Sequence, residues 1–98
     1  MVDTSIWKKY LELMNEIVGG DLRSKSRKCE LVLGRSLVAL QLRRDGYTLN
    51  EIGYVINRDH ATVVHCIDVA NDRLANTRDI EAYDIWNKFQ KEISLQKI

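Results

Sequence analysis

The stretch TLNEIGYVINRDHATVVHCIDVANDRLA, residues 48–75, decides the fold that we expect for this chain. Its start fits a capping box. The Thr48 hydroxyl can accept a hydrogen bond from the Glu51 amide, while the Glu51 carboxylate accepts one from the Thr48 amide. Apolar side chains then recur at three- and four-residue spacing. This spacing predicts a short amphipathic helix over residues 49–56.

A second and longer helix is predicted after a short turn. Asn57 and Arg58 form the turn, and Asp59 is a strong N-cap candidate for a helix over residues 60–75. Two helices joined in this way are typical of a helix-turn-helix. The first turn of the second helix is polar although core packing does not require it, so we expect it to face outward. In a DNA-binding helix-turn-helix, that turn enters the major groove.

The rest of the chain also favours helices, because it contains no proline, and proline is the strongest helix breaker. Apolar spacing and terminal glycines predict helices over residues 4–18, 27–45 and 79–94, and a short helical turn over residues 21–26. We therefore expect residues 1–98 to form one all-α domain. It should be a compact bundle of five to six helices that contains the helix-turn-helix.

The basic residues are concentrated in one part of the chain. The net charge is only +1, but residues 23–44 hold seven lysines and arginines against a single acid, Glu30. A local excess of this kind in a nearly neutral molecule indicates a surface for a polyanion. The alternative interpretation is a solvated basic face without a partner.

Several other classes of protein do not fit the sequence. Cys29 and Cys66 lie in apolar stretches, so we expect buried free thiols in a reducing cytoplasm. Neither a secretion signal nor a membrane-spanning segment is visible. His60, His65 and Cys66 lack the spacing of a closed metal site. Because a nucleophile elbow, paired carboxylates and a glycine-rich loop are also missing, we expect neither an enzyme nor a cofactor.

Four runs of the sequence together resemble a known family. They are DLRSKSRK (residues 21–28), GR (34–35), EIG (51–53) and RDHATVVH (58–65). In this order and spacing they are similar to the C-terminal DnaA-box-binding domain of the bacterial replication initiator DnaA. That domain is helical, with a helix-turn-helix like that of the Trp repressor. The resemblance extends over residues 7–73.

The resemblance implies which residues contact double-stranded DNA. Arg27 matches an arginine that enters the minor groove, and Arg35 matches one that enters the major groove. Asp59 and His60 match the family's base-reading pair, so Asp59 would both cap its helix and accept from a cytosine amino group. The remaining positions match phosphate contacts or neighbours of the base contacts. The whole expected set is Lys25, Arg27, Lys28, Arg35, Ser36, Arg43, Arg58, Asp59, His60, Ala61, Thr62 and His65.

Three departures from the family pattern put the preferred DNA sequence in question. Ala61 replaces a usual threonine, Ser36 replaces a usual glutamine, and Ile56-Asn57 replaces two glycines before Arg58. The phosphate-binding motif of the ATPase module is also missing. The sequence therefore predicts a stand-alone monomer in the cytoplasm that reads a site similar to a DnaA box and binds no nucleotide. Such a protein would act in replication initiation or its regulation, competing with or binding the full-length initiator.

Two other functions stay open at this point. The nearly neutral total charge and the changed positions Ser36 and Ala61 are compatible with a protein-interaction module that kept the fold and lost DNA binding. The second open function is that of a transcription regulator that binds an operator unrelated to the DnaA box. Trp7, Trp86 and Phe89 are expected to belong to the core and not to a stacking platform for single strands.

Overall fold

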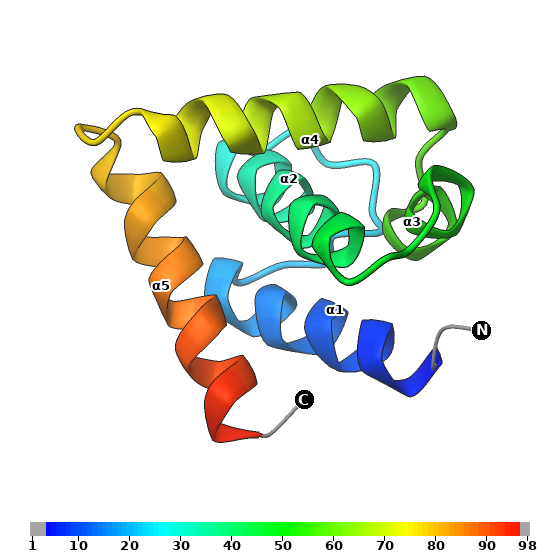
Figure 1. Cartoon of the computed structure of the whole chain (residues 1–98), viewed down its shortest axis with the longest axis horizontal. Coiled ribbons are helices and arrows are strands. Elements are labelled where there is room, and N and C mark those ends of the chain that lie inside the picture. The colour runs from blue at the N-terminus through cyan, green and yellow to red at the C-terminus, as the bar shows by residue number, and fades with distance from the viewer. Residues whose placement is uncertain (1–3, 97–98) are drawn as a thin grey trace.

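The computed structural model describes residues 4–96, and Figure 1 shows their arrangement. These residues form helices and no strands, which confirms the predicted all-α class and gives five helices. The helices are α1 (Thr4–Val18), α2 (Cys29–Arg44), α3 (Leu49–Ile56), α4 (His60–Ala75) and α5 (Ile80–Leu95).

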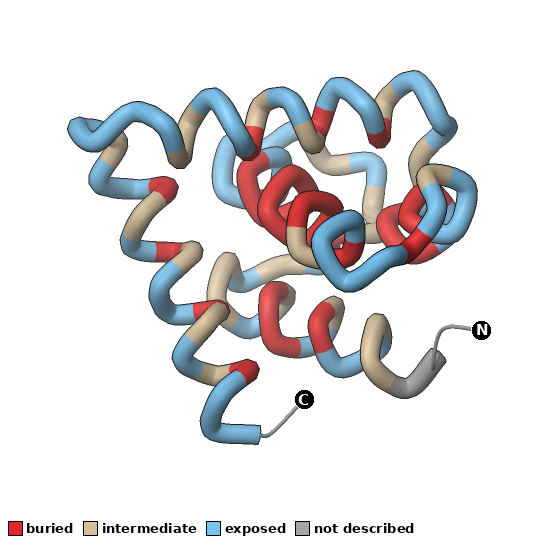
Figure 2. Tube along the Cα trace, in the orientation of Figure 1, coloured by how far each residue is buried: buried red, intermediate tan, exposed pale blue. Residues whose placement is uncertain are grey.

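Helix α2 forms the centre of the molecule. It packs against all four other helices, with α4 across one side of it and α1 on another (Figure 1). Residues 33–40 of α2 are buried without a break, as the red tube in Figure 2 shows. A helix that is buried on all sides is the core element of a fold. Its N-terminal end, where the chain becomes exposed again, follows directly on residues 23–28, one of the two segments on which the candidate site is built.

The caps predicted for α3 and α4 are present. The Thr48 side chain accepts from the Glu51 amide at 3.1 Å, and Glu51 Oε1 accepts from the Thr48 amide at 2.8 Å. Asp59 Oδ1 accepts from the Thr62 amide at 2.8 Å at the start of α4. Asn57 ends α3 with a left-handed backbone, φ 57°, which asparagine tolerates better than most residues. The bounds of both helices agree with the sequence prediction.

The turn between α3 and α4 is tight, and Gly53 makes this possible. The Arg58 amide donates to the Gly53 carbonyl at 2.9 Å. A Cβ atom on Gly53 would lie 2.6 Å from the Arg58 carbonyl oxygen, closer than two such atoms approach. The missing side chain therefore lets the backbone after Asn57 fold back onto α3 before α4 begins.

Residues 21–26 differ from the prediction, because they form turns and no helix. Asp21 Oδ1 accepts from the Arg23 amide at 2.9 Å, which is a turn contact and not a helix cap. The carbonyls of Leu22, Arg23 and Ser24 accept hydrogen bonds from distant side chains. These hydrogen bonds from side chains elsewhere in the fold hold residues 22–24 in turns, in place of the predicted helical turn.

Some predictions of burial were wrong at the helix ends and edges. Cys29 is exposed, because it is the first residue of α2, whereas Cys66 is buried as expected. Val32 of α2 and Val64 of α4 are 41% and 39% exposed, although both are apolar residues within helices. Phe89 is fully buried, and Trp7 and Trp86, also predicted to join the core, are half-buried and pack against the core cluster.

Two negative findings concern residues 4–96. None of their helices has the length and apolar character that crossing a membrane requires. Their histidines, cysteines and acids form no group of three or more that could hold a metal ion.

Candidate nucleic-acid interface

The basic segment and the first turn of α4 lie side by side, although about 35 residues separate them in the sequence. The Asn57 side-chain amide donates to the Arg23 carbonyl at 3.1 Å, and Arg58 Nη2 donates to the Ser24 carbonyl at 2.7 Å. These bonds fasten residues 23–28, which we call the basic loop, to the α3–α4 turn. The neighbourhood predicted from the sequence is therefore present in the structure.

A hollow of about 540 Å³ separates the basic loop from α4. Its lining is rich in donors and basic groups and contains no carboxylate. The residues are Lys25, Ser26, Arg27, Val32, Arg35, Asn57, Arg58, Thr62, His65 and Cys66. Six of the twelve expected DNA-contacting residues thus border a single concave surface.

Arg35 does not have the role that the resemblance implied. The residue is only 4% exposed. Its Nε donates to the Leu22 carbonyl at 2.6 Å and its Nη2 to the Ser24 carbonyl at 3.0 Å. A guanidinium held in this way cannot reach a base edge in the major groove. The structure instead makes Arg35 a buried support of the basic loop, because it donates hydrogen bonds to two carbonyls that lie outside any helix.

Ser36 is also buried, contrary to its expected place at the DNA. It is 1% exposed, and its hydroxyl donates to the Val32 carbonyl one turn earlier in α2 at 3.1 Å. Burial raises the pKa of the neighbouring Cys66 thiol on α4. Position 36 therefore belongs to the contact between α2 and α4.

Arg58 has features both of an expected DNA contact and of a residue that supports the basic loop. It borders the hollow but is only partly exposed, and its guanidinium donates to the carbonyls of Asn57 at 2.8 Å and Ser24 at 2.7 Å. Ser24 thus accepts from two arginines, since Arg35 bonds to the same oxygen. Burial, and next the positive charge of Arg58, lower the pKa of Arg35. Two like charges converge here on one neutral carbonyl.

Three expected contacts of the basic loop are exposed and available. Lys25, Arg27 and Lys28 are all exposed, and none of them forms an ion pair with another described residue. The loop therefore carries three positive charges that the described part of the protein does not neutralise. This is the electrostatic property that a phosphate backbone requires of its partner.

The first turn of α4 faces outward as predicted. Asp59, His60 and Ala61 are exposed, Thr62 is partly exposed, and His65 is exposed one turn later. The bond with the Thr62 amide lowers the pKa of Asp59, so its carboxylate is charged at neutral pH. A carboxylate has lone pairs for more than one donor, so the cap leaves Asp59 able to accept a further hydrogen bond.

Arg43 is separate from this surface. It lies eight residues beyond Arg35, which is about 12 Å along a helix, and its Nη1 donates to the Tyr47 carbonyl at 3.0 Å. The side chain is exposed, but it does not line the hollow beside the basic loop. The structure thus brings together ten of the twelve expected residues, in or beside that hollow, leaves Arg43 apart and places Ser36 in the core.

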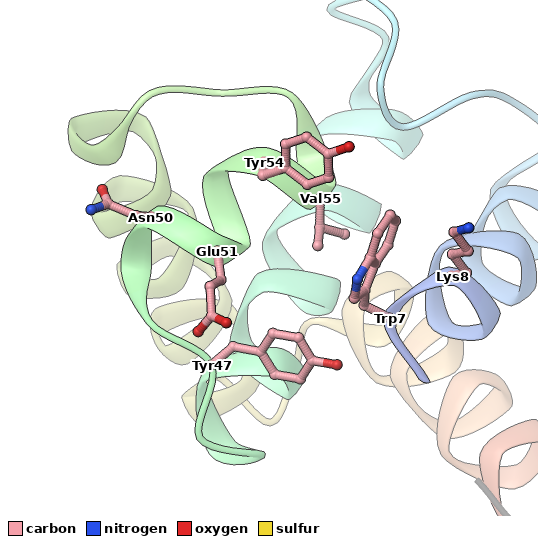
Figure 3. A pocket seen from close by; sticks show the side chains of 7 residues that line it. All are labelled: Trp7, Lys8, Tyr47, Asn50, Glu51, Tyr54 and Val55. Carbon is pink, nitrogen blue, oxygen red and sulfur yellow. The ribbon is translucent and has the colours of Figure 1, made fainter. Parts of the chain in front are cut away.

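The prediction missed two residues near this surface: Arg23, the first residue of the basic loop, and Tyr54, which borders a depression together with Asp59 and His60. Tyr54 is 65% exposed on α3, and the Arg23 guanidinium lies over its ring at 5.4 Å. The other edge of Tyr54 meets Trp7 with ring centroids 5.8 Å apart (Figure 3). An exposed aromatic residue in the middle of the helix pattern was the available signal for this site.

A second hollow, of about 560 Å³, lies on the Trp7 side of Tyr54. Figure 3 shows it between Trp7, Tyr54 and Tyr47, with Val55 at its base and Glu51 at its edge. Glu51 is occupied with the capping box, and its bonds to Thr48 lower its pKa.

In comparisons with known proteins, no family model, no curated protein and no solved structure matches the chain.

Proposed function

We propose that this protein binds double-stranded DNA in a sequence-specific manner through the first turn of α4 and the basic loop. One observation carries the proposal. Three exposed cations without an ion-pair partner in the described residues lie beside the outward-facing start of a 16-residue helix, and side-chain hydrogen bonds hold the two segments together. A helix of this kind fits the major groove of B-DNA.

The buried arginine changes the expected division of roles. Because Arg35 is bound to backbone carbonyls, base reading rests on Asp59, His60 and Ala61 at the start of α4. Asp59 accepts from a cytosine amino group, and the Ala61 methyl contacts a thymine methyl. The positive end of the helix dipole favours a phosphate near this turn.

The basic loop supplies most of the affinity and a second groove contact. Lys25 and Lys28 bind phosphates, and Arg27 enters the minor groove as the family resemblance suggests. His65, one turn along α4, contacts a further phosphate. Three to four neutralised phosphates predict a slope of about −3 to −4 for log K against log salt concentration.

The biological role we propose follows the resemblance described above. The protein would occupy sites similar to DnaA boxes as a monomer and affect replication initiation, without nucleotide or catalysis of its own. A cytoplasmic location belongs to the same proposal. The changed position Ala61 in α4 and the buried Arg35 imply a site that differs from the family's usual box in the bases read by these residues.

Selection from a random duplex library tests the proposal directly. A winning sequence similar to a DnaA box supports it, and the affinity for that winner should fall steeply with salt. An unrelated winner instead supports a transcription regulator with its own operator. If no duplex is enriched even at low salt, DNA binding is wrong and the protein-interaction module remains.

A further inference from the structure

Arg23 is the basic-loop residue whose guanidinium is most firmly oriented without being neutralised. Its Cζ lies 5.4 Å from the centre of the Tyr54 ring. Tyr54 in turn meets Trp7 edge to face, with an interplanar angle of 89°. Cation–π and edge-to-face contacts of this kind are each favourable at a surface. The three side chains therefore form a stack that begins on α1, crosses α3 and ends at the basic loop.

The backbone of Arg23 is fixed as well. Its amide donates to Asp21 Oδ1 at 2.9 Å, and its carbonyl accepts from the Asn57 side chain at 3.1 Å. The plane of the guanidinium is thus set by the ring, and its origin is set by the α3–α4 turn. A side chain held at both ends loses little further freedom when it binds a ligand.

The guanidinium has unused hydrogen-bonding capacity. Neither its Nε nor its terminal nitrogens donate to another described residue, and because Nε is buried, a ligand would meet the two terminal nitrogens. Within residues 4–96 no carboxylate forms an ion pair with Arg23, because the three ion pairs there involve Arg73 and Lys88. An oriented arginine without an acidic partner is suited to a planar, two-point contact with a phosphate.

The position of Tyr54 relates this stack to the proposed interface. Tyr54 borders a shallow surface depression together with Asn57, Asp59 and His60. Asn57 and Arg58 border both this depression and the hollow beside the basic loop. The stack therefore lies on the α3 side of the α4 start, while Lys25 and Arg27 lie on the loop side.

We propose that Arg23 binds a DNA phosphate and that Tyr54 is the positioning residue that holds it. This inference rests on the proposed DNA-binding function and extends the interface from the basic loop onto α3. Arg23 would contact the backbone next to the bases that Asp59 and His60 read, so it would raise affinity for all duplexes alike. Neither residue is among the contacts that the sequence predicted.

Four variants and one control test the inference, with affinity for the selected duplex measured over a range of salt concentrations. Arg23→Gln should weaken binding about tenfold and make the salt slope shallower by about one. Arg23→Lys should keep the slope, because the charge remains, but lose part of the affinity, because a lysine provides no planar fork. Arg78→Gln removes one exposed charge at the other end of α4 and should bind as the wild type does.

The two tyrosine variants separate positioning from simple charge. Tyr54→Phe keeps the ring, so binding should be unchanged. Tyr54→Leu removes the aromatic face and should weaken binding several-fold while the salt slope stays near the wild-type value. A thermal melt of each variant shows whether the fold is retained.

The possible failures are distinguishable. If the wild type binds no duplex, the proposed function is wrong and this inference falls with it. If the wild type binds and Arg23→Gln behaves like Arg78→Gln, only the inference is overturned. A weakened Arg23→Gln with an unchanged slope and a lowered melting temperature also overturns it, because Arg23 would then be a structural residue of the loop.

Discussion

Positive charge is neutralised by carboxylates at the C-terminal end of α4 but not at its N-terminal end. At its C-terminal end, the Arg73 guanidinium bonds both oxygens of Asp79, at 2.6 and 3.0 Å, and lies 4.0 Å from Glu81. Asp79 also caps α5 by accepting from the Ala82 amide. At the N-terminal end, the arginines donate to backbone carbonyls, and the exposed cations of the basic loop form no ion pair with residues 4–96.

The difference also appears in two arginines, the half-buried Arg73 in the last turn of α4 and the buried Arg35 of α2 near the α4 start. The hydrogen bond to Asp79 raises the pKa of Arg73, whereas burial and the neighbouring Arg58 lower the pKa of Arg35. The positive charge at the C-terminal end of α4 is therefore neutralised, whereas the N-terminal end has an excess of positive charge. A DNA phosphate backbone would supply the missing negative charge.

The largest effect should come from removing the exposed charge of the basic loop. Changing Lys25, Arg27 and Lys28 together to glutamine should weaken duplex binding by about a hundredfold or more, since two phosphate contacts and the minor-groove contact of Arg27 are lost. The matched control changes Arg78, Lys88 and Lys91 to glutamine and alters the net charge by the same amount at the other end. Fluorescence anisotropy with a labelled duplex measures both. Equal losses would show that only net charge matters.

The next largest effect concerns the buried arginine. Arg35→Ala leaves the Leu22 and Ser24 carbonyls without that donor and opens a cavity, so the free energy of unfolding should fall by about 3 kcal/mol. Urea denaturation followed by circular dichroism measures it. Arg27→Ala, which removes an exposed arginine, should leave stability unchanged and weaken only DNA binding. An Arg35→Ala variant as stable as the wild type would contradict the buried role.

Breaking the ion pair at the other end should matter less. Arg73→Met should lower the free energy of unfolding by about 1 kcal/mol or less, because Arg73 is one-third exposed and such pairs are weak. Duplex affinity should stay within twofold of the wild type if the two ends are independent. A large loss of affinity in this variant would mean that the C-terminal end of α4 takes part in binding.

The smallest effect is the dependence of stability on acid pH. Hydrogen bonds lower the pKa of Asp59 and of Asp79 below the ordinary 3.8. Their stabilisation is therefore complete above that value and is lost as the pH falls through the lower, folded-state pKa. Thermal melts between pH 7 and pH 2 should show this loss, and it should be larger for Asp79, which also binds Arg73. Asp79→Asn should reduce the fall in melting temperature at acid pH more than Asp59→Asn does.

Local sequence signals were sufficient for most of the secondary structure. The capping box at Thr48, the N-cap at Asp59 and the left-handed Asn57 act over three or four residues, so the bounds of α3 and α4 could be predicted from neighbours in the chain. The same holds for the outward-facing start of α4, because its polar run is a local property. The predicted helical turn over residues 21–26 was wrong, because carbonyls in this segment accept hydrogen bonds from side chains of α2 and the α3–α4 turn.

The sequence by itself thus determined an all-helical chain, a charged loop and the exposed start of α4. The tertiary structure alone decided which arginines of that loop and its neighbours are free. Arg35 and Arg27 look alike in the sequence, yet one is buried on two carbonyls and the other is exposed. The physical reason is that a guanidinium satisfies any unpaired carbonyl within reach, and reach depends on how distant segments pack.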